Sequence, residues 1–309
     1  MSKPSGEIID GEGGGGIAAG DSIAALLRRA LAEQDLKALV VRVDSPGGSV
    51  LASEEIRQAI ERFKAKGRPV AVSMANLAAS GGYWVSTPAQ RIFAQPSTIT
   101  GSIGIFSVIP SFEDALAQYG VHSDGVRTTP LSGQPDIASG FTPETDAMLQ
   151  ANIEAGYGRF IGLVAAARKK TPQQIDAIAQ GRVWDGGTAR QNGLVDQFGG
   201  LDDAIGWVAQ QAKLDSWHAA YYSSDANPYA SLLERLGGDE DEGAPANDLA
   251  ALMAQRRQLG LTRMLADVQR LLTVRGAQAY CLDCPVPDGA AARAPAGSWL
   301  QLARVWLGV

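Results

Sequence analysis

The sequence predicts an α/β protein in which parallel strands alternate with helices. Two runs rich in β-branched and apolar residues, 38–43 and 69–74, each end in a turn of small residues, and helical apolar spacing follows the first turn. This alternation is typical of parallel sheets joined by crossover helices. The chain has 309 residues, enough for a large core, and its 36 glycines exceed the usual share of about 7%. We therefore expect one compact body in which many glycines allow backbone conformations that other residues disfavour.

Charge and hydropathy exclude several protein classes. A net charge of −6 and a pI near 5.1 do not fit a basic nucleic-acid coat, so no nucleic-acid partner is expected. Two uncharged runs, 69–90 and 92–112, are broken by Gly, Pro, Ser and Thr, which predicts buried strands and loops rather than membrane helices. The first ten residues show neither a signal-peptide pattern nor an anchor, so the chain as written is expected in the cytoplasm.

The first part of the chain predicts a helix and then a strand, a turn and a second helix. A glycine-rich loop is expected at 11–20, with Asp21 as the cap of the helix that follows. Apolar residues recur there at helical spacing: Ile23, Leu26, Leu27 and Leu31. The strand at 38–43 ends at the loop 44–49, and helical spacing then continues to Gly67.

The next part repeats the pattern with smaller residues. After the strand at 69–74, residues 75–82 are expected to form a turn, and a short strand is expected at 91–94. A tight loop at 97–104 then leads to an apolar strand at 105–109.

Helices dominate the remainder of the chain. They are expected at 112–119, at 143–170, from 171 to about 180 and at 201–213, with a short helix and a final strand within 183–196. These elements complete a body of residues 1–222. The composition then changes, which predicts an acidic linker or mobile loop at 223–247 and a helical C-terminal extension at 248–309.

Histidine and cysteine are scarce. His122 and His218 lack metal-ligand spacing, so structural or surface roles are expected for both. Cys281 and Cys284 are too few for a disulfide framework or a four-ligand zinc site, and a local pair or free thiols is favoured over a redox motif. No metal or organic cofactor is expected, and a Ser-His-Asp protease is disfavoured.

Two loops have the composition of an acyl-transfer site. Gly47 and Gly48 can point backbone N–H groups at an anion beside a helix N-terminus. Ser80, among small residues and followed by Gly81, resembles an exposed nucleophile, although it lacks the Gly-x-Ser-x-Gly form. Both loops follow predicted parallel strands, where open α/β sheets build ligand sites. A simple tight turn and a plain helix start are the alternatives.

A nucleophilic Ser80 requires a base. The N–H of Gly81 and that of Gly47 or Gly48 can hold an oxyanion, but no histidine is placed to accept the serine proton. A lysine with a lowered pKa is then the natural candidate. The lysines all lie in terminal or surface-like contexts: Lys3, Lys37, Lys64, Lys66, Lys169, Lys170 and Lys213. The residues alone therefore leave the base unidentified.

Four motifs in order resemble the signal peptide peptidase A family of serine peptidases. They are Asp44–Val50, Ala78–Ser86, Thr98–Ile105 and Gly193–Asp196. The resemblance covers residues 7–222 and extends to Tyr280–Cys284, which resembles the end of the long, two-half form of the family. It implies a ClpP/crotonase-like fold of repeated β-β-α units with parallel sheets and flanking helices.

By position, the resemblance implies roles for several residues. Ser80 matches the nucleophile, and Ser102 matches the serine that orients the lysine base. The oxyanion region corresponds to Gly47, Gly48 and Gly81. Pro135 stands where the short form of the family has its lysine, so the general base is unknown. In this respect the chain resembles the C-terminal half of the long form.

The resemblance implies a Ser/Lys endopeptidase that degrades signal-peptide remnants and other apolar, extended peptides. The lysine is expected from an absent N-terminal half or from another chain, within a homo-oligomer or a complex of the two halves. The expected location is the periplasmic side of the inner membrane, with membrane contact only through an anchor missing from this chain. The alternatives are a non-catalytic assembly subunit, because of Pro135, and a crotonase-type acyl-CoA enzyme.

Overall fold

The computed structural model describes residues 6–13, 16–222 and 278–280. The expected linker at 223–247 lies outside the described residues. So does the expected helical extension at 248–309, except for 278–280, which form a strand and not a helix. Cys281 and Cys284 also lie outside the described residues.

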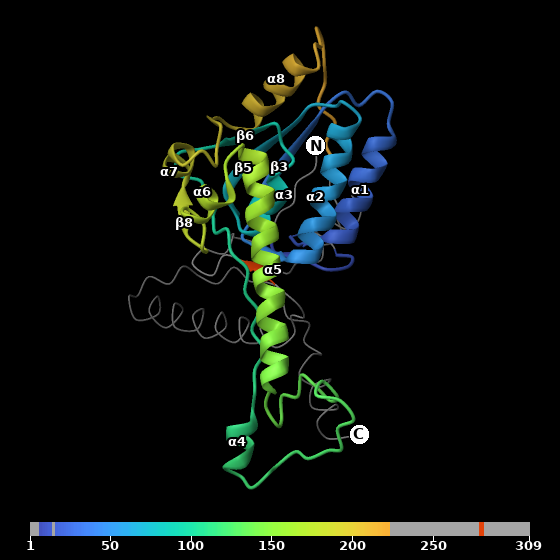
Figure 1. Cartoon of the computed structure of the whole chain (residues 1–309). Coiled ribbons are helices and arrows are strands. Elements are labelled where there is room, and N and C mark those ends of the chain that lie inside the picture. Colours follow the sequence, from blue (N-terminus) through green and yellow to red (C-terminus); the bar gives the residue numbers. More distant parts are fainter. Residues whose placement is uncertain (1–5, 14–15, 223–277, 281–309) are drawn as a thin grey trace, which may run out of the picture.

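A six-stranded, mostly parallel sheet forms the centre of the body (Figure 1). Its strands are β3 (Leu39–Ser45), β5 (Val70–Ala79), β6 (Arg91–Ala94), β7 (Ile99–Gly101), β8 (Val183–Asp185) and β9 (Gln197–Phe198). The long strand β5 pairs in parallel with β3, β6 and β7, and only β8 runs antiparallel to its neighbour. Every residue of β5 except Asn76 is buried, as its uncharged sequence predicts for a central strand.

A smaller sheet lies at the start of the fold. It is ordered β10-β4-β1-β2 and consists of β1 (Ile8–Ile9), β2 (Ala18–Ala19), β4 (Gly47–Ser49) and β10 (Gln278–Tyr280). Two successive β-β-α units open the chain. The first is β1-β2-α1, with α1 at Gly20–Ala32, and the second is β3-β4-α2, with α2 at Val50–Ala65 and with β3 in the main sheet. The expected α/β fold of such units, with parallel sheets and flanking helices, is confirmed.

Helices cover the main sheet on both faces. On one face α8 (Leu201–Gln211) packs with Ile205 and Val208 against Val40, Ala71 and Phe93 of the sheet. On the other face lie α1, α2, the short helix α3 (Gly81–Ser86) and the end of α5 (Pro143–Arg168), around the main core. Two further short helices, α6 (Pro172–Asp176) and α7 (Gly186–Gln191), complete the body.

One segment projects from the body (Figure 1). Residues 105–142, which include α4 (Glu113–Ala117) and which we call the arm, extend away from the sheets together with the first half of α5. The strand expected at 105–109 is wrong. The structure has only an isolated β-bridge there, at Phe106, and Val108 is 48% exposed, whereas a strand needs a run of paired backbone groups.

Three other expectations differ in detail. Residues 75–79, expected as a turn, continue β5, because all of them except Asn76 are buried between neighbouring elements, which overrides their weak strand propensity. The expected loop at 97–104 contains β7. Asp21 lies in the first turn of α1 and does not cap it, since Ala19 holds the cap position. Among the described residues, no helix combines the length and apolar character needed to cross a membrane.

Candidate active site

Ser80 occupies a strained turn between β5 and α3. Its backbone angles, φ 54° and ψ −114°, are unfavourable for an L-residue and persist only where the surroundings fix them. The Ser80 N–H donates to the carbonyl of Gly101 at 2.8 Å, and the Ser80 carbonyl accepts from the N–H of Trp84 at 2.9 Å. The turn is thus held on the side of the sheet and on the side of the helix.

The Ser80 side chain is buried without a partner. The residue is 0% exposed, and its Oγ makes no hydrogen bond to any described residue. Leaving a buried hydroxyl unpaired costs about 1–3 kcal/mol, so such groups need an explanation. The unpaired hydroxyl and the strained backbone together mark Ser80 as the candidate functional residue of this turn.

The two glycine loops meet at Ser80. Gly47 and Gly48 have φ of 103° and 145°, values that strongly favour glycine. A Cβ on Gly47 would lie 2.6 Å from the Gly81 nitrogen and 3.0 Å from the Ser80 Cβ, and one on Gly48 would lie 2.0 Å from the carbonyl oxygen of Ile8. Glycine is therefore required for the loop to approach the serine this closely.

The structure also brings Ser102 to the same sheet edge. Strand β7 pairs with β5 so that Gly101 lies opposite Ala79, and Ser102 and Ser80 are the next residues of the two parallel strands. Ser102 also has a positive φ, 49°, and its N–H donates to the carbonyl of Arg182 at 2.7 Å. Two serines in left-handed backbone conformations thus end adjacent strands.

Ala279 was not predicted as a site neighbour. Strand β10 runs antiparallel along β4, with Ala279 opposite Gly48. The carbonyl oxygen of Ala279 lies 2.1 Å from a Cβ built on Gly47 and 3.1 Å from one built on Gly81. Residues 278–280 gave no local signal for this contact, because the pairing joins segments more than 200 residues apart.

The fourth motif of the sequence, Gly193–Asp196, supports α3, the helix that follows Ser80. Tyr83 is fully buried, and its hydroxyl donates to the carbonyl of Leu194 at 2.8 Å. Burial raises the pKa of Tyr83, which keeps the phenol neutral. The Arg168 guanidinium donates to both carboxylate oxygens of Asp196, and Asp196 accepts the N–H of Ile92 at 2.8 Å. The motif therefore anchors α3 to the sheet.

No lysine of the described chain accompanies Ser80. Lys64 and Lys66 lie at the C-terminal end of α2, about 20 Å along the helix from the end that abuts the site. Lys37 precedes β3, at the opposite end of that strand from the Gly47 loop, and its Nζ donates to the carbonyl of Gln34. The remaining described lysines follow the C-termini of helices: Lys169, Lys170 and Lys213. Pro135 is exposed on the arm.

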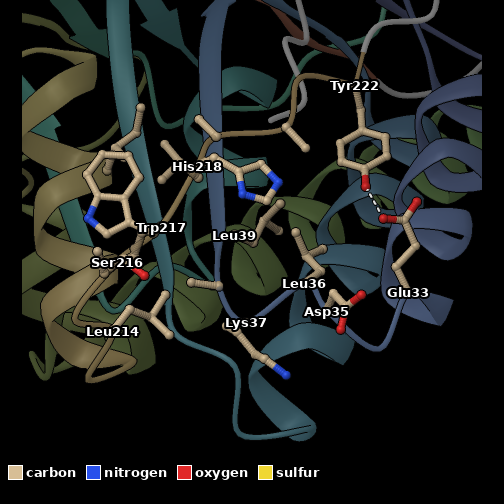
Figure 2. Close-up of a pocket in the computed structure, with 17 residues that line it drawn as sticks. Glu33, Asp35, Leu36, Lys37, Leu39, Leu214, Ser216, Trp217, His218 and Tyr222 are labelled. Atoms are coloured by element: carbon tan, nitrogen blue, oxygen red, sulfur yellow. Dashed lines mark hydrogen bonds between the residues drawn. The ribbon is translucent and has the colours of Figure 1, made fainter.

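The described residues contain no group of three or more His, Cys, Asp or Glu side chains arranged to hold a metal ion. His122 and His218 are both exposed. His218 lines a cavity of about 330 Å³ with Trp217 and Leu39, and a hydrogen bond from Tyr222 to Glu33 joins two further lining residues (Figure 2). That cavity lies beside the start of β3, whereas Ser80 follows the end of β5, so it is separate from the serine site.

Comparison with known proteins gives a consistent result. Residues 62–215 match the model of peptidase family S49. The chain is 46% identical to Protease 4 of Salmonella typhi over 282 residues, which is 90% of this chain and 45% of that protein. It is 36% identical to Putative protease slr0021 of Synechocystis over 253 residues, covering 81% of this chain and 87% of that protein.

A third relative is Putative signal peptide peptidase SppA of Enterococcus faecium, 30% identical over 66% of this chain and 60% of that protein. Among solved structures, a ClpP1 mutant of Listeria monocytogenes aligns with 66% of this chain and 94% of its own at a TM-score of 0.44 and 16% identity. The chain spans about half the length of the Protease 4 relatives. The chain belongs to peptidase family S49, and the resemblance to signal peptide peptidase A is confirmed.

Proposed function

We propose that the chain carries the nucleophilic part of a Ser/Lys endopeptidase, with Ser80 as the nucleophile. The observation that carries this proposal is the buried Ser80 Oγ, unpartnered within the described chain, in a strained turn against Gly47. Strain of this kind at a polar residue marks sites where the fold pre-organises a reactive group. Membership of a peptidase family supports the same activity.

The reaction follows from the groups around Ser80. A neutral lysine accepts the Oγ proton while Oγ attacks the peptide carbonyl carbon. The N–H groups of Gly81 and of Gly47 or Gly48 stabilise the resulting oxyanion. The lysine then returns its proton to the leaving amine, an acyl-serine forms, and water hydrolyses it by the same route. Ser102, which ends the adjacent strand, is the proposed hydrogen-bond partner that orients the lysine.

The lysine is proposed to come from another polypeptide. Pro135 occupies the arm, which projects away from the body that holds Ser80 (Figure 1). The Protease 4 relatives are about twice as long as the matched region, which supports an N-terminal half as the donor. A second copy of this chain in a homo-oligomer is the other donor that we consider.

The proposed substrates are extended, apolar peptides, including signal-peptide remnants. The name of the Enterococcus faecium relative supports this class. The proposed location is the periplasmic side of the inner membrane, where such remnants arise. No cofactor is needed for the proposed chemistry.

The test is cleavage of a fluorogenic apolar peptide by the chain alone and by the chain mixed with a lysine-bearing N-terminal half. Ser80→Ala serves as the control in both. We expect no cleavage by the chain alone and Ser80-dependent cleavage by the mixture. Cleavage by the chain alone would place the base within a homo-oligomer, and six described lysines and Lys3 would then be substituted in turn. If neither the chain alone nor the mixture cleaves the peptide, although the two halves form a stable complex, the result would favour a non-catalytic assembly subunit.

A further inference from the structure

Glu54 is a buried carboxylate that the proposed chemistry does not use. It lies in the second turn of α2 and is 7% exposed. Its carboxylate accepts hydrogen bonds from four side chains: Arg57, Gln58, Trp84 and Arg159. Burial acts to raise the pKa of Glu54, but the hydrogen bonds from Arg57, Gln58 and Trp84 and the charge of Arg57 outweigh it and lower the pKa to about 2. Glu54 is therefore charged throughout the neutral pH range.

The four donors come from three helices. Arg57 and Gln58 belong to α2 itself and each donates at 2.8 Å. Trp84 of α3 donates its indole Nε1–H at 2.9 Å, and Arg159 of α5 donates from Nη2 at 2.8 Å. A charge-assisted hydrogen bond is about twice as strong as a neutral one, so the carboxylate ties α3 and α5 firmly to α2.

Trp84 transmits this attachment to the nucleophile. Helix α3 has six residues, too few to be stable without tertiary contacts, and it begins directly after Ser80. The backbone N–H of Trp84 donates to the Ser80 carbonyl, and the buried indole ring of Trp84 packs on the Phe160 ring with centroids 4.6 Å apart. The direction of α3, and with it the positions of Ser80 and Gly81, therefore depends on where the indole is held.

We infer that Glu54 is a positioning residue for the nucleophile and acts through Trp84. The inference rests on the proposed function, in which Ser80 attacks the substrate. Glu54 keeps the Ser80 turn and the Gly81 N–H aligned with Gly47, so that attack and oxyanion stabilisation use one fixed geometry. Arg159 holds the same carboxylate from α5, but its side chain is 58% exposed, and its loss leaves Arg57 and Gln58 in place. We expect a smaller contribution from it.

The kinetic test uses the full chain mixed with the lysine-bearing half. Glu54→Gln removes the charge of the carboxylate with little change in shape. Trp84→Phe removes the indole N–H and also leaves a smaller ring in a fully buried position, so its melting temperature is measured alongside. Glu61→Gln is the matched control, because Glu61 lies on the same helix and pairs with Lys64 and, at 3.8 Å, with Arg57, so the variant removes a carboxylate that Arg57 contacts while the bond from Trp84 to Glu54 stays. For Glu54→Gln and Trp84→Phe we expect kcat to fall about tenfold with KM unchanged within about twofold, a loss confined to the transition state. The double variant should lose little more than either single one.

A second measurement does not depend on cleavage. The amide and Cα resonances of Ser80 and Gly81 are compared by NMR in the same variants of the full chain. We expect both residues to shift in Glu54→Gln and Trp84→Phe but not in Glu61→Gln. Unmoved resonances, or a kcat equal to that of Glu61→Gln, would overturn the inference. If the wild type cleaves nothing even with its partner, the proposed function fails, and the resonances still decide whether Glu54 positions Ser80. Should Glu54→Gln not fold, Trp84→Phe decides.

Discussion

The surroundings of Ser80 and the arm follow opposite packing rules. Around Ser80, even polar side chains such as Ser53 and Ser102 are buried, and glycines are forced by approaches too close for a Cβ. On the arm, α4 has no buried residue and large apolar side chains face solvent: Val108, Phe112, Tyr119, Val121, Val126, Leu131 and Ile137. Monomeric proteins rarely leave so many apolar side chains exposed on one segment. The described side chains around Ser80 are thus closely packed, whereas most large apolar side chains of the arm are exposed, and Ile105 at its base packs against the main core.

The largest effect is expected where the packing is tightest. In Gly81→Ala, the new Cβ would lie 2.6 Å from Ser53 Oγ and 3.1 Å from both the Ala279 oxygen and the Gly47 Cα. The shift needed to relieve this moves the proposed oxyanion donor, so we expect cleavage by the mixed halves to fall about 10²–10³-fold. Initial rates with the fluorogenic peptide check this. Activity within twofold of wild type would show that the glycine loops can move, contrary to the rigid site described above.

A charge placed on the arm should weaken association with another chain and leave the folding of the body unchanged. Val126→Asp places a charge on a side chain that is 98% exposed, so the melting temperature of the body is expected to stay within about 2 °C. If the arm packs against another chain, the buried charge weakens that association at least about tenfold. Sedimentation velocity measures it, with Tyr221→Asp, 68% exposed on the body, as the control. Equal sedimentation of the two variants would remove the arm as an interface.

Acid should weaken the body through Glu54. Its folded-state pKa of about 2 lies below its ordinary value of 4.5, so its stabilising contribution is present above about pH 4.5 and is lost as the pH falls toward 2. In urea unfolding, the stability difference between wild type and Glu54→Gln is expected to shrink by about 2–3 kcal/mol from pH 7 to pH 2.5. Glu61→Gln should show no such convergence. A constant difference would mean that the hydrogen bonds do not depend on the charge.

The smallest effect is expected on the helix that joins the two regions. Gly162 lies exposed on α5, and a Cβ there would meet no atom within 4 Å. Gly162→Ala should therefore stabilise the chain by about 0.5–1 kcal/mol, the helix-propensity difference between the two residues. Thermal unfolding measures it. A loss of stability would indicate that another group packs on that face of α5. The difference in packing between the body and the arm would then be smaller than described above.

Much of the body was predictable because its signals are local. The periodic helix at 143–170 corresponds to α5, the strands at 38–43 and 91–94 to β3 and β6, and the amphipathic helix at 201–213 to α8. Expectations failed where the environment overrides propensity. Residues 75–79 extend β5 because all of them except Asn76 are buried, and the apolar run at 105–109 lies on the arm, where only Phe106 forms a β-bridge.

The candidate site divides in the same way. Gly47, Gly48 and Gly81 were predicted beside Ser80 because loops that follow parallel strands meet at one sheet edge, and the structure brings them together. The bonds from Tyr83 to Leu194 and from Trp84 to Glu54 join residues far apart in the sequence and left no pattern in it. Contacts of this kind depend on the folded topology and can be identified only in the three-dimensional structure.

The pairing of β10 with β4 has a consequence for biosynthesis. Gly47 leaves the ribosome about 230 residues before Gln278, which at roughly 5–20 residues per second is an interval of about 10–50 s. Until Ala279 is synthesised, the edge of β4 that β10 covers has no partner strand, and an unpaired edge invites other strands. The nascent chain therefore passes through a stage in which this edge is open, and the synthesis of Ala279 ends that stage.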